Sequence, residues 1–203
     1  MATLQERLDA AGIRPFPDGR PEVLPDYARI AQVFAERTLR AVGLLPAADD
    51  VGVPVVALRL GNALAYIGGG IAGVLDAKGT WVPPAPGDRP GGERLVQTWL
   101  SPRLVLLTHT PVTGGGAQRE LRAALTARDA SNCHWLLLDL TGLDRTGEHL
   151  EAIAMLDGVA IVAQAGRTTA EQLAQRMRDI PPSKSLGVML VGGDEATPTP
   201  ATR

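Results

Sequence analysis

Short runs of apolar residues without regular polar interruption dominate the second half of the chain. Four of them have the length of strands buried on both faces: 103–109, 134–140, 158–164 and 186–192. The intervals between them carry apolar residues at helical spacing, at 116–129, 146–156 and 168–179. Strict alternation of strand and helix predicts parallel strands joined by right-handed crossovers.

The first half has a less regular pattern. Asp26 can cap a helix whose apolar positions continue to about Gly43. The run "VPVVALRL" (53–60) then predicts a strand, and residues 62–77 predict the helix that follows it. A short strand is expected at "TWVPP" (80–84), before a loop rich in proline and glycine.

These elements predict one α/β domain at residues 26–193, with a doubly wound, mostly parallel sheet and helices on both faces. Residues 1–25 contain several prolines and are expected to form an irregular arm, with one short amphipathic piece at "LQERLDAAG". Residues 194–203 have no large apolar residue and are expected to be disordered. In a sheet of this kind, a ligand binds beyond the carboxyl ends of the strands.

Charge and cysteine content narrow the function classes. A net charge of −2 gives no basic surface for nucleic acid, so a nucleic-acid partner is not expected. The single cysteine, Cys133, cannot form a disulfide within the chain, and no cleavable leader pattern is present, so we expect a cytoplasmic protein. No apolar stretch is long enough to span a bilayer, so any recruitment to the inner membrane would come through a partner.

The stretch "LRLGNALAYIGGG" (58–70) lies where an α/β nucleotide-binding protein would have its phosphate loop. Such a loop follows the pattern G-x-x-x-x-G-K-[ST], and this chain contains no match to it. On the strand assignment above, the backbone passes directly through Gly61 and Asn62 into a helix, and the glycines at 68–70 serve packing inside that helix. Gly61 remains a candidate because a bare helix N-terminus can still hold an anion.

Three further features are candidates for binding. Asp139 ends an apolar strand, where proteins of this architecture hold an aspartate that positions magnesium; the alternative is a hydrogen bond to the following turn. The glycines at 114–116 can form an anion nest or simply a flexible loop. Arg167 lies just outside a strand end and either contacts a ligand or is solvated. Thr168 and Glu171 are expected to form the capping box of the next helix.

No metal site is expected. The three histidines, His109, His134 and His149, are far apart in sequence, lack metal-ligand spacing and are interpreted as polar strand-end or surface residues. The chain also contains no H-E-x-x-H or C-x-x-C motif.

Three motifs follow one another in the last third of the chain. "HWLLLDLTG" is an apolar strand that ends in aspartate, "LDGVAIVAQAGRTT" covers residues 156–169, and "LGVMLVGG" begins at residue 186. Together they resemble the carboxyl half of the bacterial tyrosine kinases of polysaccharide-export systems, which belong to the deviant-Walker class that also contains the ParA and MinD ATPases. The resemblance extends more loosely back to residues 100–121. It implies a three-layer sandwich like that of P-loop NTPases, with Asp139 at the Walker B position.

One further trace of that family is "RTLR" (37–40), which resembles the end of the E-x-x-R-x-x-R helix that mediates ring assembly between kinase subunits. Arg37 and Arg40 match the motif and are therefore the candidate interaction residues. Phe34 stands where the family has glutamate, and Glu36 is displaced by two residues, which weakens the expectation of a ring of the family's type.

The chain departs from the family at its chemical positions. The first phosphate loop is taken to be missing at residues 60–62. The second aspartate motif is taken to have become "WVPPAPGD" (81–88), and residues 193–203 contain no tyrosine that could be phosphorylated. These losses remove phosphate positioning, metal handling and the acceptor, so they predict a protein without kinase activity.

The resulting hypothesis is an inactive, tyrosine-kinase-like scaffold or accessory protein of exopolysaccharide synthesis and export, without a cofactor. Its expected partner is an inner-membrane polysaccharide copolymerase or another component of that assembly, and a homo-oligomer stays open. One alternative is an atypical nucleotide-binding or phosphoryl-transfer protein that uses ATP and magnesium through Asp139, the glycines at 114–116 and Arg167. The other is a ParA-like or MinD-like positioning protein.

Overall fold

The computed structural model describes residues 4–16, 21–77, 81, 95–109, 121–123, 125–126 and 133–192. Its helices are α1 (Leu4–Ala10), α2 (Pro25–Glu36), α3 (Val53–Ile67), the 3-10 helix η1 (Asp144–Thr146), α5 (Glu148–Met155) and α6 (Ala170–Asp179). Its strands are β1 (Ala41–Pro46), β2 (Ile71–Asp76), β3 (Leu95–Ser101), β4 (Leu104–His109), β5 (Cys133–Asp139), β6 (Gly158–Gln164) and β7 (Ser185–Val191).

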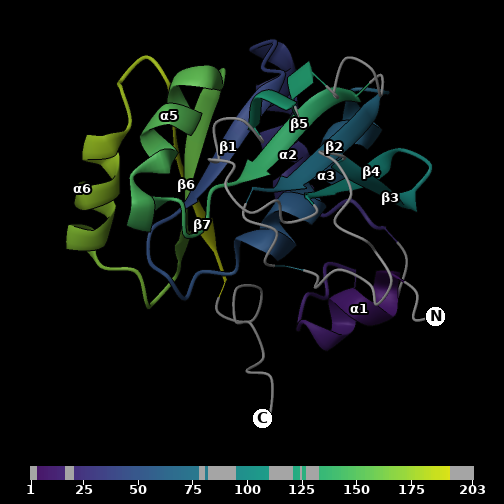
Figure 1. Cartoon of the computed structure of the whole chain (residues 1–203), viewed down its shortest axis with the longest axis horizontal. Helices are drawn as coiled ribbons and strands as arrows, with labels where there is room; N and C mark the ends of the chain where they lie inside the picture. The colour runs from purple at the N-terminus through teal and green to yellow at the C-terminus, as the bar shows by residue number, and fades with distance from the viewer. Residues whose placement is uncertain are drawn as a thin grey trace.

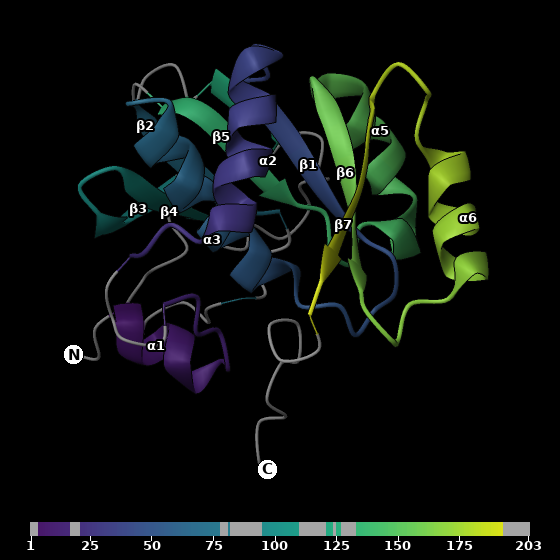
Figure 2. The same ribbon diagram turned by 180° about the vertical axis from the view of Figure 1, so that it is seen from behind.

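The strands form one sheet in the order β3-β4-β2-β5-β1-β6-β7, in which only the β3–β4 pair is antiparallel. Helices α5 and α6 lie on one face of this sheet (Figure 1). Helices α2 and α3 lie on the other face (Figure 2). The predicted fold class, a doubly wound and mostly parallel α/β sheet, is confirmed. From β1 the chain crosses β5 to reach β2, and from β5 it crosses β1 to reach β6, so a crevice is expected at the carboxyl ends of these two central strands.

The amino-terminal half differs from the sequence prediction. The helix expected to continue to Gly43 ends at Glu36, and Thr38 follows in the left-handed backbone region with φ of 54°. The next six residues, Ala41–Pro46, are all buried and form β1, the strand that follows α2. The first strand of the sheet is therefore "AVGLLP", which had been divided between the end of a helix and a loop.

Because β1 was not recognised as a strand, the elements predicted between it and residue 77 are assigned, wholly or in part, to the wrong type of secondary structure. The predicted strand at residues 53–60 is the first half of helix α3, which ends at Ile67, and the predicted helix at 62–77 contains the whole of β2. Ten residues of α3 are buried because the helix is enclosed by α2 on one side and by the sheet on the other. A helix that is apolar all round has no 3.6-residue periodicity, so its sequence resembles a buried strand.

The carboxyl-terminal half agrees with the prediction, since β4 to β7, α5 and α6 lie where the pattern placed them. Strand β3 had not been predicted, although it pairs with β4 along nearly its whole length. The expected strand at residues 80–84 is not supported at Trp81, which forms a bend, and its other residues lie outside the described part. Of the helix predicted at 116–129, residues 121–123 and 125–126 are helical.

Two apolar clusters fill the space between the sheet and its helices. One joins α2 and α3 to one face, and it includes Leu8, Ile13 and Phe16 from the amino-terminal segment. The other lies between the opposite face and α5, with partly buried Leu173 of α6 against it. No helix in the described part of the chain is long and apolar enough to cross a membrane.

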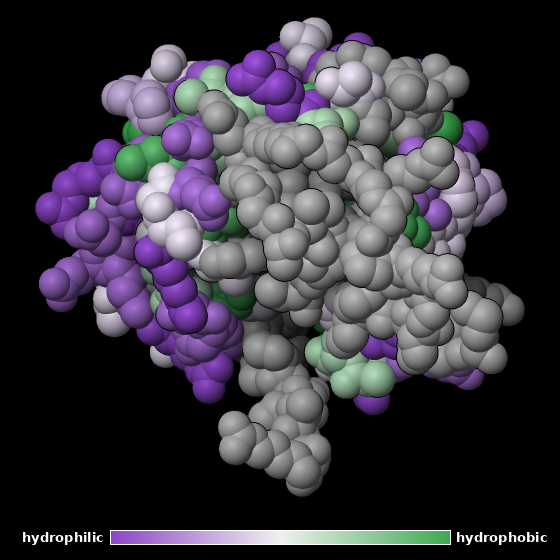
Figure 3. All heavy atoms as spheres, viewed as in Figure 1, coloured by the Kyte–Doolittle hydropathy of each residue, from purple (hydrophilic) through white to green (hydrophobic). Residues whose placement is uncertain are grey.

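Helix α6 contains no fully buried residue, and hydrophilic side chains gather over it (Figure 3). Its capping box consists of Thr169 and Gln172, one residue later than the predicted Thr168 and Glu171. The hydroxyl of Thr168 instead accepts a hydrogen bond from the main-chain N–H of Gln164, at 2.8 Å. Either threonine could cap the helix chemically. The backbone turn places Thr169 at the N-cap position and directs Thr168 toward Gln164.

Candidate functional site

The candidate site lies at the carboxyl ends of β1, β2, β5 and β6. The segment between β1 and α3, residues 47–52, occupies the strand-to-helix connection where a P-loop protein has its phosphate loop. The loop is therefore not deleted at residues 60–62, as the sequence had suggested. Gly61 lies in the middle of α3, where an added Cβ would be 2.9 Å from Val74 and 3.0 Å from Leu104. Gly61 thus allows α3 to pack closely on the sheet and is not at an anion site.

The triple glycine also has a different place from the one predicted. Helix α3 ends at Ile67, so Gly68 caps the helix and the three glycines lead into β2 instead of lying within the helix. A Cβ on Gly68 would lie 2.0 Å from the indole of Trp135, so this turn also serves close packing.

Residues 47–54, "AADDVGVP", can be compared position by position with G-x-x-x-x-G-K-[ST]. Gly52 coincides with the second glycine. Val53 then stands at the lysine position and Pro54 at the Ser/Thr position, and both lie in the first turn of α3. Val53 is fully buried in the core. The loop of normal length is present, but the cation and the hydroxyl that hold phosphate and magnesium are absent from it.

Some main-chain N–H groups of this loop are already bonded within the chain. The N–H of Ala47 donates to the carbonyl of Val162, that of Val51 to Ala48, and that of Val53 to Val51. Pro54 has no N–H to offer. A phosphate cradle needs several N–H groups that point into one space. Those of residues 48, 49, 50 and 52 have no main-chain acceptor among the described residues, so the missing lysine and hydroxyl are the clearer departure from a phosphate loop.

Acidic side chains occupy the tip of the loop and pair with arginines from neighbouring strands. Asp49 forms an ion pair with Arg145, which follows β5, with 2.7 Å between Oδ2 and Nη2. Asp50 lies 3.9 Å from Arg167, which follows β6. Arg167 is therefore half-exposed beside an acidic partner of its own chain. Two carboxylates at this position repel a polyphosphate, and the arginines that could attract one are shared with them.

A second group of polar residues lies where β2 and β5 end. Asp76 and Asp139 are opposite each other in the parallel register of these strands, and each is only 2% exposed. The main-chain N–H of Trp81 donates to Asp76 Oδ2 at 2.6 Å, and the Trp81 indole donates to Asp139 Oδ2 at 2.7 Å. The other oxygen of Asp139 accepts the main-chain N–H of Thr141, at 2.8 Å, and its hydroxyl.

Burial dominates the ionisation of Asp139. Loss of solvent raises the pKa of this carboxyl to about 6, and the negative charge of Asp76 acts in the same direction. The hydrogen bonds from Thr141 and Trp81 lower the pKa but offset only part of the burial effect. Asp139 therefore does make the turn hydrogen bond that was the alternative to a metal-positioning role.

This site does not fit a magnesium nucleotide. The loop has neither a lysine nor a hydroxyl at the required positions, its tip is acidic, and both Asp76 and Asp139 accept hydrogen bonds from Trp81. Among the described residues, no group of three His, Cys, Asp or Glu side chains could hold a metal ion. The glycines at 114–116 lie outside the described residues.

Asp76 was not predicted from the sequence, although the family resemblance was used to seek a second aspartate. The second aspartate motif was expected at residues 81–88, because the strand that ends in Asp76 had been assigned to a helix. In the structure, Asp76 is the last residue of β2. The end of this strand is the kind of position at which the second aspartate motif was expected. Asp76 therefore ends β2 as Asp139 ends β5, and Trp81 contacts both of them. An isolated aspartate after the apolar run "IAGVL" was the available signal.

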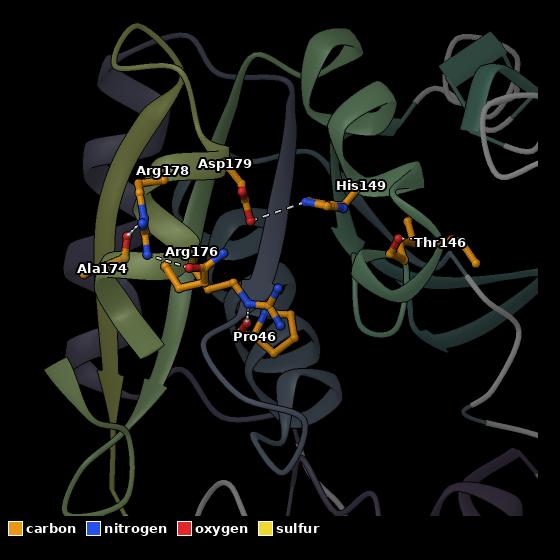
Figure 4. Close-up of polar contacts among 9 residues, drawn as sticks. Pro46, Thr146, His149, Ala174, Arg176, Arg178 and Asp179 are labelled. Carbon is orange, nitrogen blue, oxygen red and sulfur yellow. Dashed lines mark hydrogen bonds and ion pairs between the residues drawn. The ribbon is translucent and has the colours of Figure 1, made fainter. Parts of the chain in front are cut away.

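Helix α6 is held beside this site by polar contacts (Figure 4). Arg176 Nε donates to the carbonyl of Pro46, the last residue of β1, at 3.1 Å. His149 on α5 lies with its Nε2 atom 3.5 Å from Asp179 at the end of α6. His149 is buried, which corrects its interpretation as a surface or strand-end residue. These contacts connect α6 to the carboxyl end of β1 and to α5.

The predicted interaction residues lie at the opposite edge of the sheet, at the amino ends of the strands. Because α2 ends at Glu36, Arg37 is the residue after the helix and Arg40 precedes β1, so neither is on the helix body. Arg40 extends over the ring of Trp135, 5.9 Å from its centroid, and donates to the carbonyl of His134. Both arginines are exposed, but Arg40 already has a packing role within the chain.

Comparison with known proteins identifies similar folds. No protein-family model matches the chain, and no curated protein sequence matches it significantly. The chimeric protein CapA2B2 superposes with a TM-score of 0.63 at 16% identity, covering 90% of this chain and 89% of that one. The BceF tyrosine kinase domain gives 0.55 at 13% identity, with coverage of 82% and 74%. The VpsO kinase domain gives 0.57 at 15%, with coverage of 81% and 93%. The chain has the fold of these bacterial tyrosine kinase domains.

Proposed function

We propose that this protein is a kinase-fold scaffold without phosphoryl-transfer activity that serves exopolysaccharide synthesis and export. The loop between β1 and α3 carries the proposal: Val53 and Pro54 replace the lysine and hydroxyl, and the N–H groups of Ala47, Val51 and Val53 are bonded within the chain. Phosphoryl transfer depends on positioning and charge stabilisation, and this loop lacks the cation and the hydroxyl that contribute to both.

The link to polysaccharide export rests on two supports. The motifs from residue 134 onward resemble the tyrosine kinases of those systems, and the fold is that of the BceF and VpsO kinase domains. The partner we propose is the cytoplasmic end of an inner-membrane polysaccharide copolymerase or another component of the assembly. The protein would act at the inner-membrane surface through that partner.

Calorimetry tests the absence of nucleotide chemistry. Titration of the protein with ATP, ADP and GTP in the presence of magnesium should give no binding heat at micromolar concentrations, and Asp139→Ala should behave in the same way. Micromolar binding that disappears in Asp139→Ala would instead support the alternative of an atypical nucleotide-binding protein.

Complementation tests the scaffold role. Deletion of the gene should lower exopolysaccharide output, and the wild-type chain should restore it. Asp139→Asn should restore it equally, provided that its circular dichroism spectrum and its level in the cell match those of the wild type. Loss of output with a folded Asp139→Asn protein would show that the carboxylate has a chemical role.

The proposed contact surface, Arg37 and Arg40, can be tested with a substitution that is not expected to change the stability of the fold. Arg37 is exposed, and the structure gives its side chain no hydrogen bond or ion pair within the described ranges. Arg37→Ala should therefore weaken co-purification with the copolymerase without lowering the melting temperature. Arg40→Ala also removes a contact with Trp135, so this variant should lower both co-purification and the melting temperature. Unchanged co-purification by both variants would refute this surface.

A further inference from the structure

A single residue, Trp81, donates hydrogen bonds to both carboxylates at the carboxyl ends of β2 and β5. Trp81 is 3% exposed, and its two N–H groups donate to two different residues, the main chain to Asp76 and the indole to Asp139. These are short hydrogen bonds to acidic groups, the stronger kind in proteins. Asp76 and Asp139 come from neighbouring strands, so Trp81 bridges the end of the sheet at the place where the crevice is expected.

We infer that Trp81 is an internal ligand of this site, which closes the carboxylate pair from within the chain and prevents a cation or nucleotide from reaching it. The inference deepens the proposed function and rests on it, because it describes what occupies the inactive site. An indole has one N–H donor and no acceptor, which suits a carboxylate oxygen. Its large apolar ring fills the adjoining space, which a hydrated cation would otherwise need.

The loop after β1 completes the same arrangement. Asp49 and Asp50 place carboxylates at the tip of the loop, opposite Arg145 and Arg167, which are the cations that an external anion would need. The exposed ion pairs are weak individually, so Trp81 is the component that keeps the site closed. Within the described residues, these carboxylates and both arginines thus have partners from the chain itself.

Nuclear magnetic resonance of the ¹⁵N-labelled full chain can test this directly, because the protein has three tryptophans and hence three indole N–H signals. Trp99 is 49% exposed and provides an internal reference. In deuterated water, the Trp81 signal should persist at least about 100-fold longer than that of Trp99. Trp81→Phe, which keeps an aromatic ring and the main-chain N–H but loses the indole N–H, and the matched Trp99→Phe assign the two signals.

A second measurement uses Mn²⁺ alone as a paramagnetic probe. Addition of millimolar Mn²⁺ should leave the Trp81 indole signal as sharp as before in the wild-type chain. Exchange of the Trp81 proton as fast as that of Trp99, or strong broadening of its signal by Mn²⁺, would overturn the inference. If Trp81→Phe fails to fold, Trp99→Phe still identifies the exposed signal, and Trp135→Phe separates the remaining two.

The two proposals can fail separately. A rapidly exchanging Trp81 proton together with silent calorimetry would refute the closure by Trp81 and leave the inactive scaffold in place. Micromolar ATP binding together with a protected, unperturbed Trp81 signal would refute the inactive site and place the nucleotide elsewhere.

Discussion

Lowering the pH should stabilise this protein through Asp139. Burial raises the pKa of this carboxyl from 3.8 to about 6 in the folded chain. The folded state therefore binds more protons than the unfolded state between these two values, so the free energy of unfolding rises as the pH falls through 6. This contribution is fully present below pH 3.8 and is lost as the pH rises from there through 6. Its full size is about 3 kcal/mol, from a shift of about 2 units at 1.36 kcal/mol each.

Other carboxyl groups titrate over the same range, so the comparison needs a matched variant. Asp139→Asn keeps the size of the side chain and removes its titration. Urea unfolding of both proteins from pH 7.5 to pH 4.5 gives the difference in their free energies of unfolding at each pH. This difference should change by about 2 kcal/mol in favour of the wild type as the pH is lowered.

Thr141→Val provides a second check. Its hydroxyl hydrogen bond lowers the pKa of Asp139, so the loss of that bond should raise the pKa further and move the transition to higher pH. A difference between wild type and Asp139→Asn that changes by less than about 0.5 kcal/mol over the whole range would refute the reasoning. It would mean that Asp139 is as well solvated in the folded chain as in the unfolded one.

Three further substitutions test the frame around the site. Gly68→Ala places a Cβ 2.0 Å from the Trp135 indole, so it should lower the free energy of unfolding by about 1–3 kcal/mol in urea titrations, and a near-neutral result would contradict this packing. Asp157→Ala removes the acceptor of the main-chain N–H groups of Arg40 and Ala41, both at 2.7 Å, and should cost about 2–3 kcal/mol by the same measurement. Thr169→Ala removes the cap of α6 and should cost about 1 kcal/mol, with faster amide exchange in its first turn; unchanged exchange there would show that the cap contributes little.

Prediction from sequence succeeded where strands are continuous apolar runs and the intervening helices are amphipathic, although the edge strand β7 is mostly exposed and not buried on both faces as expected. Strands β4 to β7 are short apolar runs, and α5 and α6 carry polar faces, so the two periodicities separate clearly. It failed at α3 because this helix is buried between α2 and the sheet and has no polar face along most of its length. The misassigned helix then moved the expected phosphate loop to residues 60–62 and concealed Asp76.

In the candidate site, too, some residues could be identified from the sequence and others could not. Asp139 was identified because it ends a clearly recognisable apolar strand, where proteins of this architecture hold an aspartate. Trp81 was expected to be part of a short strand at residues 80–84, and nothing in the sequence around it indicates that its two N–H groups bond carboxylates from two strands. A contact between residues 58 positions apart, Trp81 and Asp139, is a property of the sheet order and leaves no local pattern.

By itself, the sequence determined the class of fold, the lack of a lysine-bearing phosphate loop anywhere in the chain, and the position of Asp139 at a strand end. These follow from composition, periodicity and local spacing, which act over a few residues at a time. Only the tertiary structure decided which apolar run is the first strand, where the altered loop lies, and that Asp76 and Asp139 face each other beneath Trp81. Those depend on which segments pack together, because burial by distant parts of the chain sets both the backbone state of an apolar run and the partners of a polar one.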